Sequence, residues 1–118
     1  MKTLTFLSRK APFGSSSAKA CQDMVLASAV FEQNINYVFM DDGVWQLLRG
    51  HAPDHIGAKN TPAALQAMEL YGVENIYALD SSLAERGLDA QQLQIAVRVC
   101  TAEQLARIIR DSDVVTVL

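Results

Sequence analysis

Five short apolar runs, separated by segments with helical signals, constrain the fold of this chain more than any other feature of its sequence. Apolar runs of this length are typical of strands buried in a parallel sheet. Consecutive parallel strands need a connection that crosses a face of the sheet, and a helix is its usual form. The expected strands cover Lys2–Ser8, Asn36–Asp41, Asn75–Leu79, Ile95–Val99 and Asp113–Leu118.

Capping signals and glycines mark the ends of the helices expected between these strands. Thr61-Pro62 places a capping hydroxyl and a proline at a helix start, and Gly72 ends that helix. Two stretches, which begin at Ser82 and Thr101, have the spacing of a capping box. The expected helices cover Ala18–Gln33, Thr61–Gly72, Ser82–Gly87 and Thr101–Arg110, with one or two helical turns over Gly43–Arg49.

This alternation predicts a three-layer α/β/α domain with a five-stranded, mainly parallel sheet, as in the doubly wound flavodoxin and Rossmann folds. The chain of 118 residues is long enough for a single core, and it contains neither an internal repeat nor a linker. We therefore expect one domain over residues 1–118. The order of the strands stays open.

Charge and the lengths of the apolar runs exclude two classes of function. The net charge is −3 and the ten Lys and Arg residues form no basic stripe, so we expect no direct binding to nucleic acid. The longest apolar run, Met24–Phe31, is too short to cross a bilayer, and the first residues lack the apolar segment of a signal peptide. We therefore expect a cytoplasmic protein without membrane contact.

The helix expected over Ala18–Gln33 is apolar around nearly its whole circumference. A helix that rests on a sheet needs only one apolar stripe, and its outer face is normally polar. Because the domain is small, an apolar outer face indicates that another chain covers it. We therefore expect an oligomer, in which a homodimer is one possibility.

The carboxyl ends of the strands, where open parallel sheets bind ligands, offer several candidates for chemistry. The loop Ala11–Ser17 could hold an anion at the following helix start, but it matches neither a dinucleotide fingerprint nor a P-loop. The alternative is a loop and helix cap made of small residues. Asp41 and Asp42 could bind Mg²⁺, or they could cap the turn that follows them.

The remaining polar candidates are two histidines and two cysteines. His51 and His55 are four residues apart, but Pro53 between them disfavours a helix, so we expect no metal site and no cofactor. Cys21 lies near a helix start, where the helix dipole can lower the pKa of a thiol. Cys100 closes a strand near the expected ligand edge. A core position as a small hydrophobe is the alternative for both.

Four stretches, taken together, resemble the TusC/DsrF branch of the DsrE/F/H-like sulfur-relay family. They are APFGSSSAKACQDMVLASAV, FMDDGVWQLLRG, TPAALQAMELYGVENIY and SSLAERGL, and they cover nearly the whole chain in the right order. The Asp-Gly-Val-aromatic-Gln-Leu-Leu turn, Asp42 to Leu48, is the most specific of them.

The resemblance implies a flavodoxin-like sheet and a complex of three homologous subunits in two copies each, with sister subunits of the TusB/TusD or DsrH/DsrE type. Such a complex passes persulfide sulfur onward, in one branch to 2-thiouridine at the wobble base of tRNA and in another to dissimilatory sulfur metabolism. The resemblance also implies a relay cysteine after the third strand of the catalytic sister. The equivalent stretch here, Asn75–Asp80, contains no cysteine.

The resemblance therefore predicts a non-catalytic structural subunit for tRNA thiolation. The alternatives are a sulfurtransferase that uses Cys21 or Cys100, and a subunit for sulfur oxidation. We expect the turn after Asp41-Asp42 to project side chains toward a partner, with the chain's own core as the alternative. The predicted interface residues are Phe13, Val25, Val44, Trp45, Leu47 and Leu48.

Overall fold

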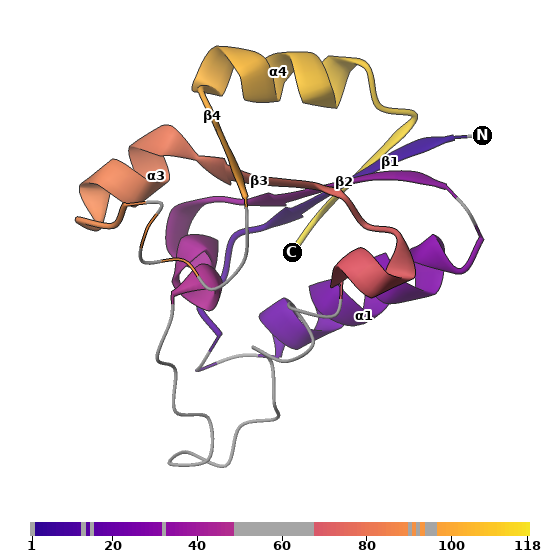
Figure 1. Ribbon diagram of the computed structural model, residues 1–118, viewed down its shortest axis with the longest axis horizontal. Coiled ribbons are helices and arrows are strands. Elements are labelled where there is room, and N and C mark those ends of the chain that lie inside the picture. The colour runs from indigo at the N-terminus through magenta and orange to yellow at the C-terminus, as the bar shows by residue number, and fades with distance from the viewer. Residues whose placement is uncertain are drawn as a thin grey trace.

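In the computed structural model, five strands form one sheet in which every neighbouring pair is parallel (Figure 1). The order along the sheet is β4-β3-β2-β1-β5. The structure describes residues 2–12, 14, 16–31, 33–48, 68–89, 91, 93 and 97–118. The strands are β1 (Thr3–Ser8), β2 (Asn34–Phe39), β3 (Asn75–Leu79), β4 (Arg98–Cys100) and β5 (Val114–Val117). The three-layer fold class predicted from the alternation is confirmed.

The sheet separates two helical layers. The described helices are α1 (Ser17–Ala29), η1 (Asp41–Leu47), η3 (Met68–Tyr71), α3 (Asp80–Glu85) and α4 (Ala102–Arg110), of which η1 and η3 are 3₁₀ helices. Figure 1 shows α1 on one face of the sheet and α4 on the opposite face, while α3 extends from the carboxyl end of β3. Among the described residues, no helix has the length and apolar character that a membrane span requires.

Side chains that alternate along the strands build a core on each face of the sheet. Phe6 of β1 joins the α1-side core, and its neighbour Leu7 joins the α4-side core. The α1-side core is the larger one, because η1 and η3 contribute apolar side chains to it. Leu105 is the buried residue that α4 contributes to the smaller core.

Two element boundaries follow the capping signals, and a third does not. Thr101 begins α4 with a complete capping box to Gln104, as expected, and Gly72 ends η3 with a φ of 84°. In contrast, α3 begins at Asp80, so Ser82 lies inside the helix and the predicted capping box there is wrong. The reason is tertiary, because the Ser82 hydroxyl accepts a hydrogen bond from the backbone of a different segment, at Asp41.

Several expected elements have other bounds in the structure. β2 runs over Asn34–Phe39 rather than Asn36–Asp41, so Asp41 begins η1 instead of closing the strand. α1 ends at Ala29 rather than Gln33, because the chain turns back to begin β2 at Asn34. β4 runs to Cys100, one residue beyond its expected end. Of the helix expected over Thr61–Gly72, only the last part lies within the described residues, as η3.

Candidate functional site

The carboxyl ends of β1, β2 and β3 meet at the η1 turn, and Gly43 allows this close approach. A Cβ atom at Gly43 would lie 2.0 Å from the carbonyl oxygen of Ser8, at the end of β1. The Gly43 N–H donates to the Met40 carbonyl over 2.9 Å, and the Met40 N–H donates to the Ser8 carbonyl over 3.1 Å. Only glycine fits between the turn and the strand, so the turn packs directly on β1.

Each carboxylate of the Asp41-Asp42 pair faces its own arginine. Arg9 Nε donates to Asp41 Oδ2 over 2.7 Å, and Arg86 Nη2 donates to Asp42 Oδ1 over 2.9 Å. Both negative charges are therefore matched by protein cations. Among the described residues, no three His, Cys, Asp or Glu side chains gather as a metal site would require.

The acidic pair does not cap η1 with its side chains, which corrects the role expected for it. Met40 holds the N-cap position, and no side chain makes a capping hydrogen bond there. Asp41 has a φ of 51°, in the left-handed region, and its N–H donates to Ser82 Oγ over 2.8 Å. The bond from Asp41 to Ser82 and the ion pair of Arg86 with Asp42 together fasten α3 to the turn, and Arg86 Nη1 also donates to the Ser82 carbonyl over 3.1 Å.

A buried glutamine fastens the other side of the same turn. Gln46 Nε2 donates to Ser8 Oγ over 2.7 Å and to the Lys10 carbonyl over 2.9 Å. Because Gln46 is buried, these bonds are shielded from water and hold the first part of the β1–α1 loop against the turn. Phe13 and Ser15 of that loop lie outside the described residues.

The position after β3 carries no thiol. β3 ends at Leu79, which is buried, and the exposed Asp80 begins α3. The two cysteines of the chain lie on other elements and on opposite sides of the sheet, Cys21 in the α1-side core and Cys100 in the α4-side core.

Cys21 is a core residue of α1. It is fully buried, and burial raises the pKa of its thiol to about 11, although the nearby hydroxyls of Ser8 and Tyr37 oppose this rise. Burial, with a further contribution from Cys21, also raises the pKa of Tyr37. The helix dipole that the sequence suggested as an activating factor is outweighed by desolvation, and the thiol stays protonated at neutral pH.

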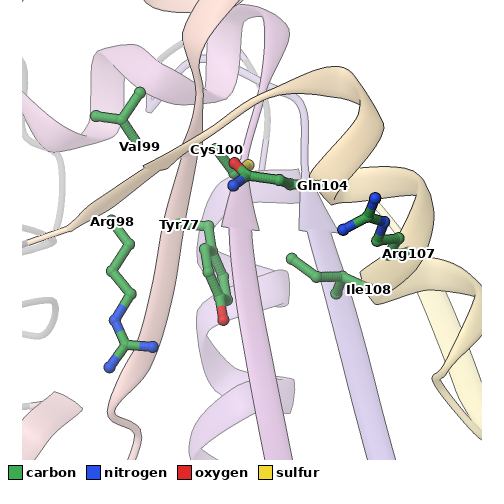
Figure 2. A pocket seen from close by; sticks show the side chains of 7 residues that line it. All are labelled: Tyr77, Arg98, Val99, Cys100, Gln104, Arg107 and Ile108. Carbon is green, nitrogen blue, oxygen red and sulfur yellow. The ribbon is translucent and has the colours of Figure 1, made fainter.

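Cys100 lies at the end of β4, beside a pocket of about 400 Å³ between β3, β4 and α4. Burial and the negative charge of Asp80 raise the pKa of its thiol. Figure 2 shows the residues around the pocket, with the guanidinium groups of Arg98 and Arg107 on opposite sides of Tyr77. The pocket is lined by Tyr77, Arg98, Val99, Cys100, Gln104, Arg107 and Ile108.

The predicted interface residues divide into two groups. Val25, Val44 and Leu47 are fully buried in the core of the chain, which is the alternative that the sequence left open for the turn. Their side chains have no surface for a partner in this fold. Trp45 and Leu48 are partly exposed, so for these two residues the interface stays a prediction. His51 and His55 lie outside the described residues.

Large apolar side chains are instead exposed on α1, on the turn after it and on η3. Phe31 is 73% exposed and Leu70 is 87% exposed. η3 packs beside α1, as the short red helix in Figure 1 shows. We call this region the α1–η3 surface, and its members are Met24, Val30, Phe31, Leu70 and Tyr71.

Sequence reasoning missed the polar residues that hold the turn and line the pocket. Gln46 and Arg86 lie inside the motifs that carried the family resemblance. The motifs therefore pointed to these residues, but they did not indicate which contacts the residues make. Arg98 and Arg107 stand in no such motif, and only the packing of α4 on β4 brings them to one pocket.

Comparisons with known proteins agree with this architecture. YchN of Escherichia coli has the same fold, with a TM-score of 0.88 over 100% of both chains at 22% sequence identity. A protein TusC homolog of Pseudomonas aeruginosa is 35% identical over 99% of this chain and 98% of its own length.

Two further relatives represent both branches. The protein TusC of Escherichia coli O8 is 32% identical over 98% of each chain. The intracellular sulfur oxidation protein DsrF of Allochromatium vinosum is 39% identical over 79% of this chain and 68% of its own length. The DsrE/DsrF-like family matches residues 2–117, and the chain therefore belongs to the DsrE/DsrF-like family.

Proposed function

We propose that this chain is a non-catalytic structural subunit of a sulfur-relay complex that serves 2-thiouridine formation in tRNA. Family membership and the similarity to TusC proteins over nearly the full length support a place in sulfur relay. The observation that carries the structural role is the burial of both thiols, together with the carboxylate in place of a thiol after β3.

Persulfide transfer sets a chemical requirement that these thiols meet poorly. An acceptor thiolate attacks the terminal sulfur of a donor persulfide, a new S–S bond forms, and the donor leaves as a thiolate when the old S–S bond breaks. With a pKa of about 11, Cys21 is ionised in roughly one molecule in ten thousand at pH 7. The donor would also have to reach a side chain with no exposed surface.

The partners in this proposal are homologous sister subunits, two copies each in a heterohexamer. The α1–η3 surface supports such an assembly, because α1 buries Val25 against the sheet and still exposes Met24 on its outer side. Exposed apolar side chains gathered in one region are typical of a surface that another protein covers. Trp45 and Leu48 are a second candidate contact.

The tRNA branch is favoured over the sulfur-oxidation branch by the extent of the matches. The TusC-named relatives align with 89% to 99% of this chain, whereas DsrF of Allochromatium vinosum aligns with 79% of it. Deletion of the gene should abolish 2-thiouridine in the affected tRNAs, measured by mass spectrometry of tRNA nucleosides. Full thiolation in the deletion strain would contradict this assignment.

Reconstitution of the complex with a cysteine-free chain tests the structural role. The double variant Cys21→Ala, Cys100→Ala should assemble with the sister subunits and support sulfur transfer within about twofold of the wild-type rate, since neither thiol carries sulfur. Thermal unfolding and light scattering establish that the variant is folded and assembled. A persulfide on either cysteine that turns over at the rate of the complex would contradict the proposal.

A further inference from the structure

We infer that the pocket between β3, β4 and α4 binds a small ligand that joins an oxyanion to a flat apolar group, such as an aryl phosphate. The lining residues of the pocket belong to β3, β4 and α4, and α4 covers the face of the sheet opposite to α1 (Figure 1), whereas Cys21 belongs to the α1-side core. The pocket's volume of about 400 Å³ lies within the range of small-molecule sites.

The charge of the lining selects an anion. Two of the seven lining residues are arginines, and none is acidic. The side chain of Arg98 forms no hydrogen bond or ion pair with any residue that the structure describes, although its backbone pairs with β3. Arg107 Nη2 lies 3.6 Å from Glu103 Oε1, and the two side chains are 63% and 82% exposed. This ion pair is therefore weak and leaves the Arg107 charge available to a ligand.

The position of the anion within the pocket follows from the neighbouring groups. Asp80 lies close enough to raise the pKa of Cys100, so the Cys100 end of the pocket repels a negative ligand. At the opposite end, the Tyr77 hydroxyl and the Arg98 guanidinium point the same way in Figure 2. Tyr77 and Arg98 are partners in the β3–β4 register, which fixes them side by side. A guanidinium and a hydroxyl are a suitable donor set for a phosphate or carboxylate.

The apolar part of the ligand has its own place. The Tyr77 ring and the Ile108 side chain line the pocket between the two arginines, as Figure 2 shows. A flat group can therefore lie against Tyr77 while its oxyanion meets Arg98.

This inference does not depend on the role of the chain in sulfur relay. It assigns no reaction to the pocket, and Cys100 enters only as a wall. A ligand here could stabilise α4 on its short strand β4 without contact with any sulfur carrier.

Titration of the ¹⁵N-labelled chain with phenyl phosphate, followed by NMR, tests the inference. Saturable amide shifts are expected in residues 98–108, with weaker binding of inorganic phosphate and none of phenol. Arg98→Ala should weaken binding at least about tenfold, because it removes a charged donor. Tyr77→Phe and Arg107→Ala should each weaken it by about threefold.

Arg110→Ala is the matched control, because it removes the same charge from α4 at a position outside the pocket. It should leave the affinity unchanged. An equal loss in Arg110→Ala, saturable shifts that survive Arg98→Ala, or the absence of saturable shifts would each overturn the inference. Intact amide spectra of the unliganded variants establish that their fold is unchanged.

Discussion

The η1 turn and the α1–η3 surface are both rich in apolar residues, but the structure uses them in opposite ways. In the turn, Val44 and Leu47 point into the core, and polar hydrogen bonds fasten the rest to β1 and α3. On the α1–η3 surface, Phe31 and Leu70 stay in contact with solvent. The difference teaches that apolar composition predicts that a residue will be covered, but not by which chain.

Insertion of a single methyl group at the turn is expected to have the largest effect. Gly43→Ala places a Cβ atom 2.0 Å from the Ser8 carbonyl oxygen, far inside van der Waals contact, so β1 and the turn must separate. We expect a loss of about 3 kcal/mol or more in the free energy of unfolding, measured by urea denaturation.

Gly72→Ala is the matched control for this variant. Its φ of 84° is strained for alanine, but a Cβ atom there meets nothing within 4 Å. It should cost only about 1 kcal/mol. Equal losses in the two variants would show that the contact with Ser8 does not decide the structure of the turn.

The inward face of α1 can be examined through the pH dependence of stability. The pKa of Cys21 is about 11 in the folded chain and near 9.0 in the unfolded chain, so only the folded chain keeps the proton between these values. The free energy of unfolding should therefore be unaffected by this thiol below pH 9 and fall by about 2 kcal/mol between pH 9 and 11.

Cys21→Ala should remove that part of the decline and leave the part that belongs to Tyr37. Denaturant unfolding of both proteins at several pH values measures the difference in slope. Identical slopes in wild type and variant would mean that Cys21 does not titrate in this window.

The fastening of α3 to the turn should have a smaller effect. Arg86 is 18% exposed at its side chain and contacts both Asp42 and the Ser82 carbonyl, whereas Asp42 is 62% exposed. Arg86→Ala should therefore cost about 1 to 2 kcal/mol and Asp42→Ala less than about 1 kcal/mol. A double-mutant cycle in urea isolates the pair, and an Asp42→Ala cost as large as that of Arg86→Ala would assign the whole effect to the ion pair.

The smallest change in stability is expected on the α1–η3 surface. Phe31→Ser should alter the free energy of unfolding by less than about 0.5 kcal/mol, because the side chain is already solvated. It should nevertheless weaken assembly with the sister subunits at least about tenfold, measured by analytical ultracentrifugation. Unchanged assembly together with a large loss of stability would show that Phe31 serves the fold of the chain and not its assembly.

The strands and the layer order were predictable because each rests on local sequence. Asn75–Leu79 is a strand with the predicted bounds, and Thr101 caps α4 through residues three positions apart. Periodicity and capping involve neighbours in the chain, so a single sequence contains them. Ser82 shows the limit, because its local capping signal lost to a hydrogen bond from Asp41, 41 residues away.

The candidate sites were predicted less well, because each depends on contacts between distant segments. The partners of Asp41 and Asp42 are Arg9 and Arg86, which lie 32 and 44 residues away in the chain. The pocket beside Cys100 forms because β4 pairs with β3 and α4 folds back over both. The residues of each ion pair are far apart in the sequence, and no local pattern links them or the elements that line the pocket.

The sequence by itself determined that the chain is an α/β sheet protein without a thiol after its third strand, since both facts depend on the order of residues along the chain. Only the tertiary structure decided that Val44 and Leu47 face inward, that Phe31 and Leu70 face outward, and that both thiols are buried. Burial is a property of the whole packed domain. Each of these side chains is covered or exposed by segments that lie far from it in sequence.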